Sequence, residues 1–185
     1  MISRFEQGAI EGTLTQNITA TDHGCATNWY LVHQNVGFTI REKNIALTSL
    51  SALSALSVVS FDNAKVFLGE TYRNTVSDNP GYKEIAPQSS HIGLLYDGTF
   101  DVVFGDEWII RYVQRQHFEK TGEYKELTVH RIMNPTLYSA RFQEQKTCDS
   151  FNAALRSLRR SGTYDQIVDG YHRRILVAAK AAIAN

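Results

Sequence analysis

Three strand-like segments alternate with three helix-like segments in the middle of the chain. The strand-like segments are short apolar or β-branched runs, at 57–61, 82–85 and 100–104. The helix-like segments show helical spacing of apolar residues or a capping residue, at 63–74, 89–96 and 107–118. Because crossover helices join parallel strands, this alternation predicts an α/β fold with a mainly parallel sheet.

Further strands are expected outside this alternation. Apolar residues alternate from 36 to 40, within a strand-like stretch at 29–40. Two more strands are predicted at 126–133 and 137–142, and another near 11–14 after a short helix.

Two amphipathic helices are predicted near the end of the chain, joined by Ser161 and Gly162. The apolar residues of the first recur at helical spacing, at Phe151, Ala154, Leu155 and Leu158. Those of the second are Tyr164, Ile167, Val168 and Tyr171. A single apolar stripe predicts that each helix packs through one face only.

The charge balance excludes one class of function. The chain has 19 Lys and Arg against 19 Asp and Glu, so its formal net charge is zero. Nucleic-acid binding needs a basic excess, and no nucleic-acid partner is therefore expected. No apolar run approaches the ~18 residues of a membrane span. Residues 1–6 lack the apolar core of a signal peptide, which predicts either a cytosolic chain or a targeting segment outside this sequence.

The two cysteines, Cys25 and Cys148, leave the redox environment open. Neither belongs to a C-x-x-C motif, so no zinc or redox site is indicated. Their separation suits either a disulfide or two buried thiols. The six histidines show no metal-ligand spacing, and the sequence has no phosphate-binding glycine loop. Neither a metal nor a cofactor is expected.

Four stretches, in this order and spacing, carry a resemblance to a known family. They are FEQGAIEG (5–12), VGFTIRE (36–42), HIGLLYDGTFDVVFGDEWIIRYV (91–113) and FNAALRSLRRSGTYDQIVDGY (151–171). Together they resemble the family 3 bacterial extracellular solute-binding proteins of the periplasmic amino-acid-binding type. The resemblance covers nearly the whole chain and implies an α/β, two-lobed, periplasmic binding protein type II-like fold.

The resemblance also implies the domain organisation. Lobe one is expected to consist of residues 1–38 and 134–185, and lobe two of residues 39–133. The family normally opens with a strand, a helix and a second strand before the position of FEQGAIEG, where this chain begins. An N-terminally truncated form is therefore expected, with an incomplete lobe one. Unpaired sheet edges in such a form invite pairing with a second copy in a homodimer.

The function that the resemblance implies is transport rather than catalysis. Family members are periplasmic solute-binding proteins of ABC transporters, so we expect a small polar, amino-acid-like ligand between the lobes and a membrane permease or sensor as partner. A periplasmic location favours a disulfide between Cys25 and Cys148. Two alternatives stay open. One is an enzyme similar to the cyclohexadienyl dehydratases, with Asp106 or Glu107 as its acid, and the other is a non-binding oligomeric remnant.

Asp106 is the sharpest candidate for a ligand contact. It ends the apolar run FDVVFGD and precedes a helix, and strand ends face the ligand crevice in open α/β sheets. The resemblance implies that its carboxylate accepts hydrogen bonds from the ammonium group of a ligand. Aspartate is also a preferred helix cap, which is the structural alternative.

The resemblance places a second ligand contact at Asn63, where the segment 63–74 begins. At this position the family uses backbone N–H groups and a hydroxyl to hold a carboxylate. This chain lacks the hydroxyl, and Asp62 adds a negative charge that would repel a carboxylate. A simple helix cap by Asp62 or Asn63 is the alternative.

Four further residues are candidates for contacts with a ligand. Trp29, Tyr30 and His33 lie near the place where the family has aromatic residues, and aromatic walls with a polar edge suit a binding cleft. Trp29 and Tyr30 could equally belong to the core. Arg41 lies at the start of the expected second lobe, where it faces either the cleft or solvent.

Overall fold

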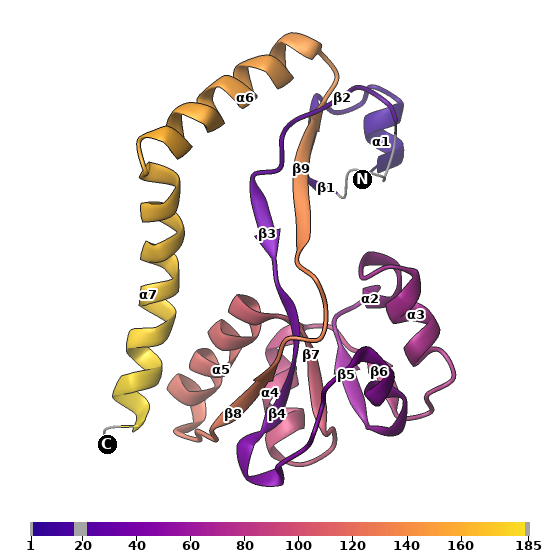
Figure 1. Cartoon of the computed structure of the whole chain (residues 1–185), viewed down its shortest axis with the longest axis vertical. Coiled ribbons are helices and arrows are strands. Elements are labelled where there is room, and N and C mark those ends of the chain that lie inside the picture. The colour runs from indigo at the N-terminus through magenta and orange to yellow at the C-terminus, as the bar shows by residue number, and fades with distance from the viewer. Residues whose placement is uncertain (1, 17–21, 184–185) are drawn as a thin grey trace. The chain divides into compact units, whose positions relative to one another are not determined.

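The computed structural model of the protein describes residues 2–16 and 22–183 (Figure 1). The chain divides into two compact units. Unit 1 consists of Met1–His33 and Pro135–Arg173, and unit 2 of Gln34–Asn134 and Arg174–Asn185. Each unit has its own β-sheet. Among the described residues, no helix is both long enough and apolar enough to cross a bilayer.

Unit 2 contains a five-stranded sheet with the strand order β6-β5-β7-β4-β8. The strands are β4 (Asn35–Ile40), β5 (Val58–Ser60), β6 (Tyr82–Glu84), β7 (Val102–Asp106) and β8 (Leu127–His130). β5 pairs in parallel with β6 and β7, whereas β4 pairs antiparallel with both β7 and β8. The prediction of a mainly parallel sheet is therefore wrong. Only the strands of the predicted alternation are joined by crossover helices, and β4 and β8 lie outside it.

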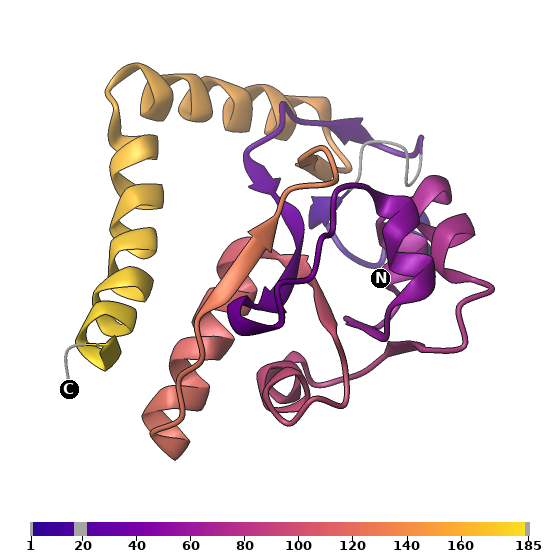
Figure 2. The same cartoon turned by 60° about the horizontal axis from the view of Figure 1, so that its bottom comes forward.

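Helices cover both faces of this sheet. They are α2 (Ala64–Phe67), α3 (Glu70–Val76), α4 (His91–Tyr96) and α5 (Glu107–Thr121), with 3-10 turns at Arg41–Lys43, Leu50–Ala55 and Gln88–Ser90. Because side chains alternate along β7, Val103 packs on the face of α4 and α5, and Phe104 packs on the face of α2 and α3. Figure 2 shows the magenta helices α2 and α3 and the salmon helix α5 on opposite sides of the sheet.

Unit 1 is built around β9 (Thr136–Phe142), which pairs antiparallel with all three neighbouring strands. These are β1 (Gly12–Gln16), β2 (Cys25–Ala26) and β3 (Leu31–His33), and the helices of the unit are α1 (Ile2–Glu6), α6 (Gln145–Arg160) and the first part of α7 (Thr163–Ile183). Phe5, Tyr138, Ala140, Cys148 and Leu155 form its buried apolar positions. Helix α6 contacts β9 and β2 in the sheet.

The predicted break between the closing helices is confirmed at Gly162, whose φ of 73° lies in the left-handed region that glycine favours. The predicted one-sided packing holds only for the first part of the pair. Leu155 is buried, but Leu158 is 39%, Ile167 51% and Tyr171 62% exposed. Ala154 is also exposed. The stripe prediction is thus wrong for these four residues, because helical spacing identifies an apolar face without identifying what covers it.

Candidate functional site

Asp106 is the last residue of β7 and the N-cap of α5. Its Oδ1 accepts hydrogen bonds from the backbone N–H groups of Trp108 and Ile109, both at 3.0 Å. Its Oδ2 accepts a third from the N–H of Gln34 at 3.1 Å. The residue is 6% exposed. The carboxylate of Asp106 therefore caps helix α5. A contact between this carboxylate and the ammonium group of a ligand stays a prediction.

Glu107 is the centre of an ion triad with two arginines. Its Oε1 accepts hydrogen bonds from Nε and Nη2 of Arg111 at 3.0 and 2.9 Å. Its Oε2 accepts one from Nη2 of Arg131 at 2.6 Å. The side chain of Glu107 is 8% exposed, whereas that of Arg131 is 59% exposed. Because one carboxylate faces two guanidinium groups, this Glu107 triad carries an excess of positive charge.

Beside this triad, unit 2 has an open groove of about 600 Å³. This volume lies within the range of small-molecule sites, roughly 300–1,000 Å³. The groove is formed by the 3-10 turn before β5, the start of α3 and the segment that follows β8. Its lining residues are Leu50, Leu68, Gly69, Glu70, Thr71, Arg131, Ile132, Met133 and Asn134. Asp106 and Glu107 are not among them.

Gln34 connects the groove segment with the cap of α5. Its Nε2 donates to the carbonyl oxygen of Met133 at 2.9 Å, and its backbone N–H donates to Asp106. A second connection is the pair of Glu107 with Arg131. The segment from Arg131 to Met133 is therefore held by two independent contacts, which orient the wall that it contributes to the groove.

Asn63 occupies the N-cap position of α2 with left-handed backbone angles, φ 62° and ψ 22°, and its side chain makes no capping hydrogen bond. The N–H groups of Asn63 and Lys65 both donate to the carboxylate of Glu84, each at 2.9 Å. The hydroxyl of Tyr82 donates to the same carboxylate at 2.9 Å. The resemblance implies that backbone N–H groups at this position bind the carboxylate of a ligand. In this chain, the N–H groups of Asn63 and Lys65 instead bind the carboxylate of Glu84. The role of Asn63 in ligand binding stays a prediction.

Two buried tyrosines pack behind this contact. The rings of Tyr72 and Phe104 lie 4.9 Å apart, and those of Tyr72 and Tyr82 lie 6.1 Å apart. Burial raises the pKa of Tyr72 to about 12, and burial also raises the pKa of Tyr82. At neutral pH the hydroxyl of Tyr82 is therefore protonated and able to donate to Glu84.

Arg41 follows the last residue of β4, and its Nη1 lies 2.8 Å from Oε1 of Glu126. Both side chains are more than half exposed. Asp106 pairs with Asn35, at the opposite end of the same strand. At ~3.3 Å per residue, the backbones of positions 41 and 106 lie about 20 Å apart. Contact of Arg41 with a ligand stays a prediction.

Trp29, Tyr30 and His33 belong to unit 1, where each contacts other residues of that unit. The guanidinium group of Arg159 lies 4.0 Å from the ring centre of Trp29. The ring of Tyr30 meets Phe151 edge-on at 5.6 Å, and that of His33 meets Tyr138 at 5.0 Å. Trp29 and Tyr30 thus help to hold α6 on the sheet, and their contact with a ligand stays a prediction.

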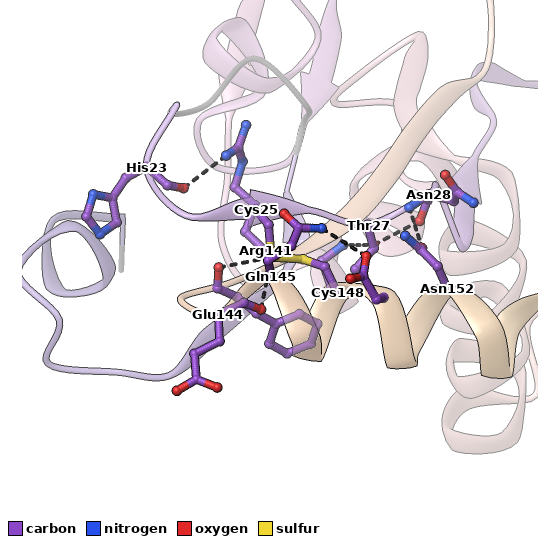
Figure 3. Close-up of a disulfide and its surroundings, with 12 residues drawn as sticks. His23, Cys25, Thr27, Asn28, Arg141, Glu144, Gln145, Cys148 and Asn152 are labelled. Atoms are coloured by element: carbon purple, nitrogen blue, oxygen red, sulfur yellow. Dashed lines mark hydrogen bonds between the residues drawn. A yellow bond between two sulfur atoms is a disulfide. The ribbon is translucent and has the colours of Figure 1, made fainter.

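A disulfide joins Cys25 of β2 to Cys148 in α6, as expected from the resemblance. The two Cα atoms lie 6.3 Å apart, and 123 positions separate them in sequence. Figure 3 shows the disulfide and the side chains around it. Nearby, the N–H of Asn28 donates to Oδ1 of Asn152 at 2.8 Å, and Nη1 of Arg141 donates to the carbonyl oxygen of His23 at 3.0 Å. These contacts fasten α6 and the loop around β2 to the sheet.

The sequence did not point to the groove or to Arg131. Arg131 lies in an expected strand, at 126–133, but β8 ends at His130. Only the pair with Glu107, 24 positions away, places this arginine at a groove. Within the described residues, no cluster of three or more His, Cys, Asp or Glu residues could hold a metal ion.

Comparison with known proteins identifies the fold. No protein-family model and no curated protein sequence matches the chain. Solved structures do match. The GluR0 ligand-binding core in complex with L-glutamate matches 92% of this chain and 76% of its own length, with a TM-score of 0.70 and 15% identity.

Two bacterial binding proteins match in the same way. An amino acid ABC transporter substrate-binding protein from Streptococcus pneumoniae, bound to L-arginine, matches 94% of this chain and 73% of its own, with a TM-score of 0.67 and 13% identity. The arginine-, lysine-, histidine-binding protein ArtJ from Geobacillus stearothermophilus matches 91% and 72%, with a TM-score of 0.63 and 14% identity. The chain therefore has the two-lobed α/β fold of amino-acid-binding periplasmic proteins, as the sequence resemblance predicted.

Proposed function

We propose that this chain is a solute-binding protein that holds a small amino-acid-like molecule and delivers it to a membrane permease or sensor. The observation that carries the proposal is a fold shared over more than nine tenths of the chain with proteins that bind L-glutamate, L-arginine or other amino acids. A groove of small-molecule size in unit 2 supports it. Binding between the two lobes is what the resemblance implies, and it stays a prediction.

Binding without catalysis is part of the proposal. The two acids that the enzyme alternative would use are Asp106 and Glu107, and each is only 6% exposed. Asp106 receives three backbone N–H groups, and Glu107 receives two guanidinium groups. Neither residue lines the groove, so neither is placed to give a proton to a molecule bound there.

A periplasmic location is also proposed. The disulfide between Cys25 and Cys148 supports it, because disulfides persist in oxidising compartments such as the periplasm. The charge balance of 19 basic against 19 acidic residues supports a small solute rather than a nucleic acid as the partner.

The proposal predicts that an amino acid stabilises the purified protein. The oxidised full chain is freed of copurified ligand and heated with each of the 20 common L-amino acids, including L-glutamate and L-arginine. A ligand at 100 times its dissociation constant adds about 2.7 kcal/mol to the folded state, so one or a few amino acids should raise the melting temperature by several degrees. Calorimetric titration then measures the affinity.

The matching control is the D-enantiomer of each amino acid that stabilises the protein. The proposal is wrong if no L-amino acid of the panel raises the melting temperature. Asp106→Asn tests the predicted ammonium contact in the same assay, since asparagine offers one acceptor oxygen without charge. Turnover of a bound molecule that disappears in this variant would favour the enzyme alternative. A clean monomer in light scattering would count against the oligomeric alternative.

A further inference from the structure

The groove of unit 2 carries charged groups of both signs on separate segments. Arg131 lies on the segment after β8, and Glu70 begins α3. Apolar side chains of the groove come from the same segments, including Leu68, Ile132 and Met133. A ligand that has both a carboxylate and an ammonium group, with an apolar body between or beside them, matches this lining in charge and polarity.

The guanidinium group of Arg131 is both oriented and incompletely used. Glu107 receives only its Nη2, at 2.6 Å, so Nη1 and Nε have no partner among the described residues. The carboxylate of Glu107 also serves Arg111, and the triad therefore keeps an excess positive charge. The Arg131 side chain is 59% exposed, and Nη2 has a second N–H besides the one that it gives to Glu107. Together with Nε or Nη1, that N–H can donate two parallel hydrogen bonds to a carboxylate.

Among the described residues that line the groove, Glu70 is the only acidic one. Its nearest basic partner among the described residues is Arg73, at 3.8 Å, and their side chains are 77% and 51% exposed. An exposed pair at this distance is weak, so the carboxylate of Glu70 remains able to accept hydrogen bonds from an ammonium group. By contrast, the donors of Asn63 and Lys65 are already occupied by Glu84.

We propose that Arg131 binds the carboxylate, and Glu70 the ammonium group, of a zwitterionic amino-acid-like solute in the groove of unit 2. This inference rests on the proposed function. It adds the two residues that bind the two charged groups of the ligand. It assigns the ligand's carboxylate to Arg131, which pairs with the buried Glu107, rather than to a helix N-terminus. It assigns the ammonium group to Glu70 in place of Asp106, whose carboxylate accepts three backbone N–H groups and does not line the groove.

A fragment titration tests the groove independently of the natural solute. Butyrate has a carboxylate and an apolar tail, and butyramide has the same shape without the charge. Each is added to the full, oxidised ¹⁵N-labelled chain at constant ionic strength, so that screening does not change. Butyrate should shift the amide signals of residues 68–71 and 131–134, with a dissociation constant on the order of 10 mM, whereas butyramide should bind much more weakly.

Arg131→Gln and Arg111→Gln form a matched pair of variants. Each removes one positive charge and one arginine partner of Glu107, but only Arg131 lines the groove. Arg131→Gln should weaken butyrate binding by about tenfold or more, and Arg111→Gln by less than about twofold. Glu70→Gln should leave butyrate binding unchanged and weaken binding of an L-amino acid.

One further variant, Arg131→Lys, and the Glu70→Gln variant keep the test decisive if Arg131→Gln does not fold. Arg131→Lys retains the charge and a contact with Glu107 but lacks the planar pair of donors, so it should weaken butyrate binding by a smaller factor. Glu70→Gln lies outside the Glu107 triad and should leave the fold intact. The dispersion of the amide spectrum and the melting temperature verify folding of each variant.

Several outcomes would overturn the groove assignment. They are an absence of butyrate shifts at 68–71 and 131–134, equal binding of butyramide, or equal weakening by Arg131→Gln and Arg111→Gln. If an amino acid binds the wild type but its affinity is unaffected by Arg131→Gln and Glu70→Gln, the groove assignment fails and the proposed function stands. If butyrate binds as expected while no amino acid of the panel does, the assignment of Arg131 stands and the proposed function fails.

Discussion

Asp106 and Gln34 show how a single carboxylate serves two elements of unit 2. Oδ1 of Asp106 satisfies two N–H groups at the start of α5, which have no partner within the helix, and Oδ2 satisfies the N–H of Gln34 before β4. A substitution at this position therefore disturbs a helix and a strand together. Any loss of ligand affinity in a variant of Asp106 has to be compared with its loss of stability.

His91 is a second residue whose surroundings decide its chemistry. It is fully buried, and its Nε2 donates to the carbonyl oxygen of Ile85 at 2.8 Å. Its Nδ1 has no hydrogen-bond partner among the described residues. Burial lowers the pKa of His91 below its ordinary value of 6.5, because a charged imidazole would lose its hydration there.

This histidine should make unit 2 less stable in mild acid. Below pH 6.5 the unfolded chain binds a proton at His91 that the folded chain does not bind, so the free energy of unfolding falls as pH drops from 6.5 towards the lowered folded-state pKa. The slope is at most ~1.4 kcal/mol per pH unit for one group. Urea unfolding at pH 7.5 and 5.5 measures it, with Trp108 as the reporter of unit 2 in a Trp29→Phe background.

His91→Gln is the control variant, because glutamine can donate to Ile85 but does not titrate. It should have a smaller loss of stability between the two pH values than the wild type. His130, whose pKa is also lowered by burial, should account for part of the remaining slope. The same pH slope in wild type and His91→Gln would show that residue 91 is not the source.

At the scale of elements, the apolar face of the closing helices is used unevenly. Phe151 and Leu155 of α6 pack against unit 1, and the hydroxyl of Tyr164 in α7 donates to the carbonyl oxygen of Tyr30 at 2.7 Å. Farther along α7, Ile167 is 51% exposed. Both helices have apolar residues at the same helical spacing. The apolar residues that are buried should therefore stabilise unit 1, and the exposed ones should contribute little.

Leu155→Ala and Ile167→Ala test this difference within unit 1. Truncation of the buried leucine removes packing and leaves a cavity, so it should lower the free energy of unfolding by about 2–5 kcal/mol. Truncation of the exposed isoleucine should change it by less than about 0.5 kcal/mol. Urea unfolding in a Trp108→Phe background follows unit 1 through Trp29. Equal effects of the two substitutions would contradict the burial difference.

At the scale of the whole molecule, the long segment of unit 2, Gln34–Asn134, is inserted between the two chain segments of unit 1. The disulfide between Cys25 and Cys148 closes a loop that contains nearly all of unit 2. Unit 1 is thereby assembled from segments that are far apart in sequence, and its sheet depends on β9 to join them. Without the disulfide, the chain loses conformational entropy on folding when it brings the two ends of this long loop together.

Removal of the disulfide should destabilise unit 1 selectively. The Cys25→Ser, Cys148→Ser double variant should lose about 2–5 kcal/mol in the free energy of unfolding, because the disulfide restricts the unfolded chain over 123 positions. Trp29 fluorescence during urea unfolding reports the loss. The transition of unit 2, followed through Trp108, serves as the internal control. A larger effect on unit 2 than on unit 1 would contradict this account.

Local sequence signals determined much of the fold. Apolar runs and capping residues predicted β5, β6, β7, α4 and α5, because strands and helices of this length depend mainly on the residues within them. The break at Gly162 followed from the backbone freedom of glycine. The family resemblance, carried by four short stretches, added the arrangement of these elements into a two-lobed fold.

Long-range contacts decided the rest. The antiparallel direction of β4, the Glu84 contact with Asn63, the exposure of Ile167 and the placement of Arg131 by Glu107 all join residues or surfaces that sequence spacing does not relate. Asp106 could be placed at the end of a strand and before a helix from its sequence, and its two donors Trp108 and Ile109 are local. Its third backbone donor is Gln34, 72 positions away, which only the tertiary structure brings beside it. Sequence by itself thus specified segments, and tertiary packing specified which of their polar groups remain available to a ligand.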